Sequence, residues 1–455
     1  MDTFYDSSWY FMRFCDATND SEPFDRQSVD YWMNDGVDLY IGGIEHAVMH
    51  LLYARFFTKF TRDSGMNDVG EPFGRLVCQG MLNAPAPYCS ECNSEYHVDY
   101  SGSDCPSCGD QLSSRSAKMS KSLGNTVSPE DMISKYGADT VRLFILFGAN
   151  PEAGMDWSDS ALEANNRQIY SIIDAFESSL NFTNSPSDID HWLSARLREN
   201  HRKWVKAMSD VSLREGVMVS HFQMLSDWNW YIRRGGRDKS ATIQFLKGWA
   251  PMLAPATPHL AEEFWKKIGQ GGIVANLEIE NPGENPDDLL TMAKEKFVKD
   301  IISSGRNLKT LAERHSKADI TKVVIQTSPK WKADLALEAI RLNDENFDFE
   351  EEGHRHLKAL DVFNNEKTRG EVFQAWSSFT TGSKKKRGRI HTWSDGEKSL
   401  ISMEIDETKV INANSGFIAT ELGVETVEAY GAGQGEDVGG KAKLASPLEP
   451  GIAFV

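Results

Sequence analysis

The sequence lacks a long apolar run: none reaches the roughly 18 residues that a membrane-spanning helix needs. Its first eight residues also lack the basic region and the apolar stretch of a secretory signal. Internal repeats and long low-complexity tracts are absent, so nothing indicates a repeat array. We therefore expect a soluble, cytoplasmic protein, and 455 residues suffice for about three domains.

Basic residues are scarce relative to acidic ones. The chain has 49 lysines and arginines against 67 aspartates and glutamates, which gives a net charge of −18 and a pI of about 5.1. This deficit argues against a protein that binds nucleic acid over its whole surface. It leaves room for a large RNA that docks on local basic patches. The most basic run is Lys384–Arg389, which as an isolated cluster would be a solvated loop.

Cysteines are few, but four of the six form two C-x-x-C pairs, at Cys89 and Cys92 and at Cys105 and Cys108. In a cytosolic chain this spacing favours a metal over disulfides. Four thiolates complete a tetrahedral zinc site and leave no position for a reactive water. The pattern therefore predicts a structural zinc ribbon within residues 84–115, and we expect His97, between the pairs, to be a surface residue.

The segment Lys118-Met119-Ser120-Lys121-Ser122 combines two lysines with small hydroxyl side chains, and Gly124 and Asn125 follow it. Lysine acts as a point charge for phosphate, and glycine lets the backbone approach an oxygen. The segment therefore predicts a mobile cationic loop suited to polyphosphate. The alternative is an ordinary solvated basic loop.

The amino-terminal part shows strand and helix patterns. Val37–Gly43 is a short apolar run that ends in two glycines, which predicts a buried parallel strand, and ligands of open α/β sheets bind at that end. Ile44–Phe60 has the apolar spacing of a helix, with His46 and His50 on one face. A zinc-binding helix is one interpretation, but H-E-x-x-H is absent, so core histidines are favoured.

Downstream patterns are mostly helical. Ser128 and Pro129 predict a helix start, and apolar residues continue at helical spacing from Met132 to Phe147. Residues 281–288 form a polar linker. Beyond it we expect a long helix at 289–314 and two β-then-α units, the first with a strand at 322–326 and a helix at 331–342, the second with a strand at 399–405, a helix that ends near 423 and a further strand at 424–430.

Several strings together resemble a known family. KMSKS, followed by SLGN and by YGADTVR at 136–142, resembles the second signature of class I aminoacyl-tRNA synthetases. The strings DTFYDSSWY, DLYIGGIEHAVMHLLYARFF and CQGM resemble bacterial-type leucyl-tRNA synthetases and match valyl, isoleucyl or methionyl enzymes less well. DWNWYIRR at 227–234 and PMLAPATPHLAEEFW at 251–265 match the family's tRNA-binding helical bundle.

The resemblance implies an α/β fold, the second half of a class I Rossmann-like catalytic domain with a zinc-ribbon insertion, then an α-helical tRNA-binding bundle and a small α/β carboxyl-terminal domain. The expected domains are residues 1–158, with the ribbon at 84–115, residues 159–285 for the anticodon-binding-type bundle, and residues 289–455 for the tRNA-binding appendix.

The resemblance also implies an ATP-dependent leucine–tRNA ligase. The leucine carboxylate would attack the ATP α-phosphate, pyrophosphate would leave, and leucyl-adenylate would esterify tRNA(Leu). Lys118 and Lys121 would be catalytic, stabilising charge on the phosphates, and Mg²⁺ would accompany ATP. ATP would contact Gly43, Glu45, Gln79, Lys118, Ser120 and Lys121.

The same resemblance assigns a leucine pocket to Phe4, Ser7, Tyr10, His46 and His50. Aromatic rings and neutral imidazoles can wall an apolar pocket. The resemblance also favours contacts with tRNA from Arg233, Arg234, Arg237, Lys384, Lys385, Lys386 and Arg387. Ordinary surface charge is the alternative for the first three. Trp228, Trp230 and Tyr231 are expected in the core rather than stacked on bases.

The family's first signature, H-x-G-H, does not occur among the eleven histidines. The first half of the nucleotide-binding fold and the editing domain are therefore missing, and we expect either a second protein chain or a missing amino-terminal half of this polypeptide to supply them. Expected partners are tRNA(Leu), leucine and ATP, with no membrane and no DNA. The alternative is a non-catalytic tRNA-binding subunit or remnant.

Overall fold

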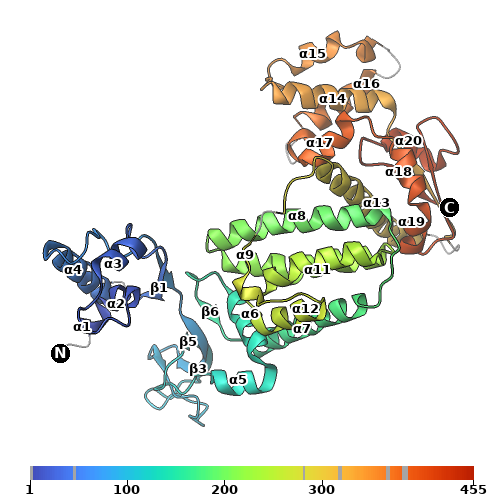
Figure 1. The fold of residues 1–455 in the computed structure, drawn as a ribbon. Coiled ribbons are helices and arrows are strands. Elements are labelled where there is room, and N and C mark those ends of the chain that lie inside the picture. The colour runs from blue at the N-terminus through green and yellow to red at the C-terminus, as the bar shows by residue number, and fades with distance from the viewer. Residues whose placement is uncertain (1–3, 45–47, 280–281, 316–319, 365–368, 382–387) are drawn as a thin grey trace. The chain divides into compact units, whose positions relative to one another are not determined.

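The computed structural model describes the chain except residues 1–3, 45–47, 280–281, 316–319, 365–368 and 382–387 (Figure 1). The chain divides into two compact units. The first comprises residues 1–182, 200–229 and 242–281, and the second comprises residues 183–199, 230–241 and 282–455. Within the described residues, no helix combines the length and the apolar character that crossing a bilayer would require.

The amino-terminal part of the first unit packs short helices against a two-stranded parallel sheet. Its elements are α1 (Phe4–Ser7), α2 (Tyr10–Cys15), α3 (Arg26–Trp32), β1 (Tyr40–Gly43), α4 (Met49–Asp63) and β2 (Leu76–Gln79). Strand β1 is parallel, as predicted, but it is not buried: Ile41 is 42% exposed. The reason is that β2 is its only partner strand among the described residues, so one face and one edge stay uncovered.

The cysteine-rich segment forms an antiparallel sheet of β4 (Ser94–Glu95), β3 (Leu82–Cys89) and β5 (Ser113–Lys118), in that order. The short strand β6 (Met155–Asp156) pairs with β3 in parallel. The Asn83 side chain donates a 3.3 Å hydrogen bond to the Asp156 carboxylate, and Ser116 Oγ donates to the same carboxylate oxygen. The lysine-rich loop thus leaves from the end of a strand that is fixed on one side by β3.

The predicted helix start at Ser128 is confirmed: its hydroxyl accepts the Asp131 N–H at 3.3 Å, and Pro129 opens α5 (Pro129–Tyr136). The predicted continuous helix to Phe147 is wrong in one respect, because Gly137 at φ 85° ends α5 and α6 (Ala138–Gly148) begins after it. A positive φ is accessible to glycine without a steric penalty, so the chain turns there.

Helical elements complete the first unit, and some helices divide their residues between both units. They are α7 (Asp159–Ser179), α8 (Asp188–Ser209), α9 (Leu213–Val217), the π-helical turn η2 (Met218–Gln223), α10 (Met224–Arg233), α11 (Lys239–Leu253), α12 (Pro258–Lys267) and the 3₁₀ turn η3 (Val274–Asn276). Stacked aromatic rings form their core: Phe176 lies 3.8 Å from Phe264 and 5.1 Å from Trp249, between centroids. Trp228 is buried, as predicted.

The segments 136–142 and 251–265, which both contribute to the family resemblance, are hydrogen-bonded to one another. The Asp139 carboxylate, in α6, accepts the Leu260 N–H at 2.8 Å and contacts His259 Nδ1 at 2.8 Å, at the start of α12. The Arg142 guanidinium donates to the carbonyls of Pro255 and Ala256 at 2.8 and 3.0 Å. The strings at 136–142 and 251–265 therefore form one structural joint between the segment that follows the lysine loop and the helical bundle.

The second unit contains a three-stranded sheet in the order β8 (Thr426–Tyr430), β7 (Lys322–Gln326), β9 (Gly451–Phe454), with β8 parallel and β9 antiparallel to β7. Its helices are α13 (Asp288–His315), α14 (Lys330–Asp344), α15 (Gly353–Ala359), α16 (Arg369–Phe379), α17 (Asp395–Ser402), α18 (Glu407–Ala413), α19 (Ser415–Leu422) and α20 (Lys441–Leu444), with 3₁₀ turns η4 (Asp361–Asn364), η5 (Arg389–His391) and η6 (Val438–Gly440).

Most of the predictions for this unit are confirmed, namely the long helix, the strand at 322–326 with its helix, and the strand that ends at Tyr430. The strand predicted at 399–405 is wrong, because α17 occupies that position. Ser394 and Glu397 form a reciprocal capping box that starts this helix. Tyr231 is buried and Trp230 is partly buried against the core of this unit, as predicted.

Candidate functional site

The carboxyl ends of β1 and β2 lie side by side. Gly43 and Gln79 are the last residues of these parallel strands, and they are direct partners in the register. Open α/β sheets bind ligands at this end. A cavity of about 270 Å³ adjoins Gln79 and is lined mainly by apolar side chains, including Ile41, Leu82 and Ile145. The structure thus brings together two of the predicted ATP contacts, and Glu45 lies outside the described residues.

The lysine-rich loop is anchored close to Gln79, because the Met119 N–H donates at 3.1 Å to the carbonyl of Leu82, which follows Gln79 by three residues. The buried Asn125 side chain holds the loop's other end. Its Oδ1 accepts the Ser120 N–H at 2.9 Å, and its Nδ2 donates to the Ala84 carbonyl at 3.3 Å. Sequence reasoning noted Asn125 but not this role, since only the fold brings β3 beneath it.

Lys118 ends β5 and Lys121 sits in the turn, and both side chains are exposed. The Ser120 hydroxyl stays within the loop, accepting the Leu123 N–H at 3.2 Å and lying 3.1 Å from Ser122 Oγ. Such a loop can offer two ammonium groups and backbone N–H groups to an anion, on a base that Asn125 keeps rigid. The catalytic and ATP-binding roles of these residues stay predictions.

Of the predicted leucine-pocket residues, Tyr10 and His50 are joined by a residue that the sequence did not single out. Tyr40 Oη lies 2.8 Å from Tyr10 Oη and 2.7 Å from His50 Nε2. The Tyr40 ring also stacks on Phe73, with centroids 3.9 Å apart. Burial, and next the hydrogen bond to Tyr10, raise the pKa of Tyr40, so it stays a neutral phenol that can donate to the imidazole. His50 is a buried, hydrogen-bonded histidine, as favoured over a zinc helix.

The remaining pocket residues lie nearby in α1. The Phe4 ring stacks on Tyr53 of α4 at 5.9 Å, and Ser7 Oγ donates to the Phe4 carbonyl at 3.1 Å. The ring contact attaches α1 to α4, the helix that carries His50. His46 lies outside the described residues, and the leucine-binding role of the whole set stays a prediction.

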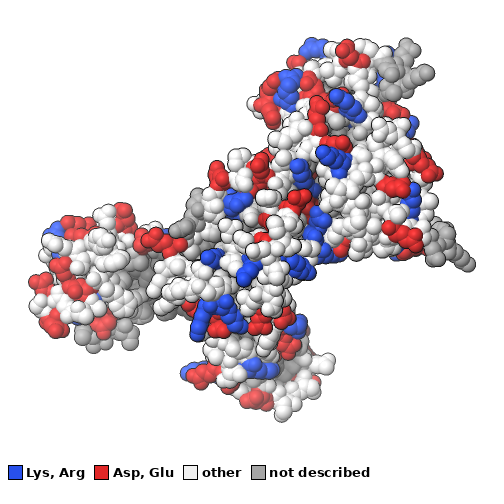
Figure 2. All heavy atoms as spheres, turned by 45° about the vertical axis from the view of Figure 1, so that its right-hand side comes forward, with Lys and Arg blue, Asp and Glu red and all other residues white. Residues whose placement is uncertain are grey.

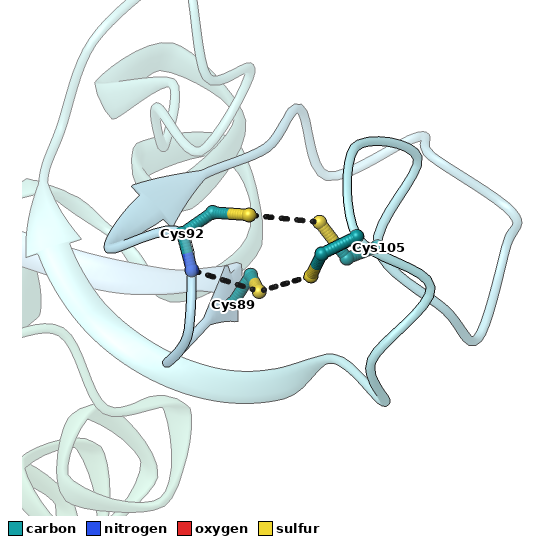
Figure 3. A group of neighbouring side chains, drawn as sticks. Cys89, Cys92 and Cys105 are labelled. Atoms are coloured by element: carbon teal, nitrogen blue, oxygen red, sulfur yellow. Dashed lines mark hydrogen bonds between the residues drawn. The ribbon is translucent and has the colours of Figure 1, made fainter.

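The four paired cysteines converge. Their sulfur atoms all lie within 4.8 Å of one another, and Figure 3 shows those of Cys89, Cys92 and Cys105 pointing toward a common centre. Cys89 and Cys108 Sγ are 3.5 Å apart. The Tyr96 hydroxyl, 3.0 Å from Cys105 Sγ, lowers the pKa of Cys105 to about 6.

The arginines that were predicted to contact tRNA have hydrogen-bond or ion-pair partners within the second unit. Arg233 pairs with Glu421, and Arg234 pairs with Glu295 at 2.7 Å with only 14% of its side chain exposed. Arg237 Nη1 donates to the Ile232 and Gly236 carbonyls at 2.9 and 2.6 Å. These contacts give all three a structural role, and contact with tRNA stays a prediction. Lys384, Lys385, Lys386 and Arg387 lie outside the described residues.

Charge on the surface is mixed rather than segregated. Figure 2 shows lysines and arginines interspersed with aspartates and glutamates on the face that it draws. On this face the basic side chains therefore do not form one continuous basic surface, in keeping with a net charge of −18.

Comparison with protein families gives two matches. Residues 190–325 match the family described as the anticodon-binding domain of tRNA ligase, and residues 111–158 match tRNA synthetases class I (I, L, M and V). The second match covers β5, the lysine loop and the joint with the bundle. The first covers α8 to β7.

Curated relatives are leucine–tRNA ligases. The chain is 37% identical to that of Fusobacterium nucleatum subsp. nucleatum over 61% of its own length and 34% of the relative, and 34% identical to that of Crocosphaera subtropica over 71% of its own length and 38% of the relative. The chain therefore spans about a third of the length of the curated relatives that it matches.

A solved structure is also similar. It is the ternary complex of Agrobacterium radiobacter K84 agnB2 LeuRS with tRNA and LeuAMS, at 25% identity and a TM-score of 0.50, over 72% of this chain and 35% of that chain. Together these matches confirm the resemblance to leucyl-tRNA synthetases, a class I synthetase fold of mixed α/β and helical content, and an anticodon-binding domain.

Proposed function

We propose that this chain, which resembles leucine–tRNA ligases, forms part of such a ligase and supplies its phosphate-binding loop and its tRNA-binding helices. One observation carries the proposal. The Lys118–Ser122 loop is anchored to Leu82, three residues after Gln79, and Gln79 lies at the carboxyl ends of the parallel strands. A nucleotide at the strand ends would therefore have its phosphates within reach of both lysines.

In the proposed reaction, the leucine carboxylate attacks the ATP α-phosphate and pyrophosphate leaves, after which the leucyl group passes to tRNA(Leu). Lys118 and Lys121 stabilise the charge that develops on the phosphates. Gly43, Gln79 and Ser120 contact ATP through strand-end and loop groups, as does Glu45. Mg²⁺ bound with ATP would neutralise part of the phosphate charge.

The leucine pocket is proposed around Phe4, Ser7, Tyr10, His46 and His50. The hydrogen-bonded series Tyr10–Tyr40–His50 supports this, because it fixes the direction of two pocket side chains without leaving a buried polar atom for the ligand to satisfy. A pocket of this kind separates side chains by shape, and one methylene is worth only about 1–3 kcal/mol. An editing domain elsewhere in the complete enzyme is therefore also part of the proposal.

The test of the proposed function is amino-acid-dependent ATP–pyrophosphate exchange by this chain combined with a protein that carries H-x-G-H. Leucine should support exchange, and valine, isoleucine and methionine should support it far less. Exchange with one of these three amino acids but not with leucine would assign the chain to another class I enzyme. Exchange with none, despite intact tRNA binding, would favour the non-catalytic tRNA-binding subunit.

For the four cysteines we propose a structural zinc ion. The fit is chemical as well as geometric. Hydrogen bonds to neighbouring sulfurs, that to Cys108 foremost, raise the pKa of Cys92 to about 12, so its thiolate is disfavoured while no cation lies among the sulfurs. A zinc ion would supply that cation and hold the loops between the strands.

We predict one zinc per chain, bound by Cys89, Cys92, Cys105 and Cys108. Elemental analysis of purified protein should give a ratio close to one, and Cys105→Ser should lower it. Cys15→Ser is the matched control, because that thiol lies in α2 and contacts the Phe11 carbonyl instead. Protein without zinc, or an unchanged content in Cys105→Ser, would remove the site.

For tRNA we propose a partly electrostatic contact in which the run Lys384–Arg387 takes part. Binding should weaken as salt rises, with a slope of log K against log salt of about −0.7 to −0.9 per neutralised phosphate. Neutralising these four residues should flatten the slope. A control that exchanges the lysines for arginine and Arg387 for lysine keeps the charge and should keep the slope. An unchanged slope after neutralisation would return the run to ordinary surface.

A further inference from the structure

The segment Cys89–Cys108, which carries the four cysteines and is called the cysteine module below, contacts the chain at two points just after Lys118–Ser122. The Val98 N–H donates to the Leu123 carbonyl at 2.9 Å. Next to it, the His97 ring lies directly against Gly124: a Cβ added to Gly124 would stand 2.5 Å from both Cε1 and Nε2 of the imidazole. His97 is exposed, as expected, with 46% of its side chain accessible, and its ring packs on a loop residue that follows it by more than twenty positions.

Gly124 is required here for two independent reasons. Its φ is +68°, a conformation that other residues adopt only with strain. The His97 ring fills the space that any side chain would need. Because backbone and ring approach so closely, the position of the His97 ring and the conformation of the loop at Gly124 depend on each other.

His97 is in turn held by the module. Its Nδ1 accepts the Asp99 N–H at 3.2 Å, which fixes the ring direction. The preceding residue, Tyr96, donates its backbone N–H to the Pro87 carbonyl at 2.9 Å, and its hydroxyl lies 3.0 Å from Cys105 Sγ. A continuous series of contacts therefore runs from the sulfur cluster through Tyr96 and His97 to Gly124.

We propose that the four-cysteine module braces the Lys118–Ser122 loop, with His97 as a positioning residue, so that metal binding by the cysteines sets the position of the loop that holds polyphosphate. That the loop holds polyphosphate rests on the proposed function, whereas the brace itself rests on the contacts described above. Asn125 anchors the loop base to β3 and β5 without the module. The brace therefore acts on the carboxyl side of the loop, at Leu123 and Gly124.

Amide hydrogen exchange of the full chain tests the brace without leucine, ATP or tRNA. The Gly124 N–H bonds to the Ser120 carbonyl at 3.1 Å, so its exchange reports opening of this turn. Removing zinc with a chelator should accelerate exchange at Gly124 by about tenfold or more. His97→Ala should accelerate it by about fivefold to tenfold while one zinc per chain is retained. The Ser120 N–H, held by Asn125, should change much less in either case and is an internal reference.

Two further variants separate a brace from a general loss of stability. His191→Ala removes an exposed histidine of α8 and should leave exchange at Gly124 unchanged. Gly124→Ala should disturb the loop less in the His97→Ala background than in the wild type, because the ring it collides with is gone.

The proposal is overturned if His97→Ala leaves Gly124 exchange within twofold of wild type, if zinc removal does so, or if the chain binds no zinc. None of these readouts depends on catalysis. If the brace passes this test but the chain supports no leucine-dependent exchange even when combined with a protein that carries H-x-G-H, the proposed function is refuted and the brace stands. The reverse result would refute the brace alone.

Discussion

Replacing Lys121 by alanine is expected to lower leucine-dependent ATP–pyrophosphate exchange by about 10²–10³ in the complete enzyme. This is the usual effect of removing one preorganised group that stabilises charge in the transition state. The loop supports so large an effect because Asn125 and the Met119–Leu82 hydrogen bond fix its base, so the backbone that carries Lys121 is already positioned before the reaction. Affinity for leucine should change little, because the contact is made to phosphate.

The measurement is the leucine-dependence of exchange at saturating ATP, which separates the maximal rate from the KM for leucine. Lys135→Ala is the matched control: this lysine is also exposed, one helix beyond the loop, and lies over the Tyr136 ring at 4.7 Å. It should retain wild-type exchange. Wild-type exchange in Lys121→Ala would instead end the assignment of the loop to phosphate binding.

Signals that act within a few residues could be predicted from the sequence. Ser128 and Pro129 start α5 because a hydroxyl and a missing N–H both suit a first helical turn. The long helix α13 and the buried strand β7 follow from their apolar periodicity. Local competition also explains one error: residues 399–405 carry an apolar alternation, but the capping box at Ser394 had already committed them to a helix.

Contacts between distant segments could not be predicted in the same way. The cysteine spacing indicated that four sulfurs converge, yet nothing local indicates that His97 packs on Gly124 or that Tyr40 joins Tyr10 to His50. Each of these contacts is made by tertiary packing between segments that are 10 or more residues apart. The family resemblance proposed the pocket residues but did not indicate Tyr40, which contacts two of them.

An unpartnered apolar surface lies beside the proposed site. Along α4 the exposed large side chains follow one helical stripe, with Val48, Leu52 and Phe56 at 77%, 65% and 69% exposure. The adjoining strands β1 and β2 pair only with each other among the described residues, so both have an open edge. A contiguous apolar surface next to open strand edges is an aggregation hazard unless protein covers it.

We propose that the covering protein is the segment that carries H-x-G-H, either in a longer form of this polypeptide or in a second chain. The relatives are about three times as long as the part of them that this chain matches, and the string H-x-G-H is missing here. A parallel strand added to the edge of β1 or β2 would extend the sheet, and its own helix would cover the stripe on α4.

The expected consequence is that residues 1–455 alone show no measurable leucine-dependent exchange, and that a protein bearing H-x-G-H restores it. Both sides of a class I site are needed to hold the phosphate in its transition state, and the lysine loop provides only one.

Leu52→Asp should block restoration, because a charge in the stripe cannot be desolvated without a partner. Leu311→Asp, at an exposed apolar position of α13, is the control and should be restored normally. Robust exchange by the isolated chain would refute the requirement for a protein bearing H-x-G-H and would mean that a second phosphate site exists within this chain. Restoration that is blocked by Leu52→Asp but not by Leu311→Asp would locate the shared interface on α4.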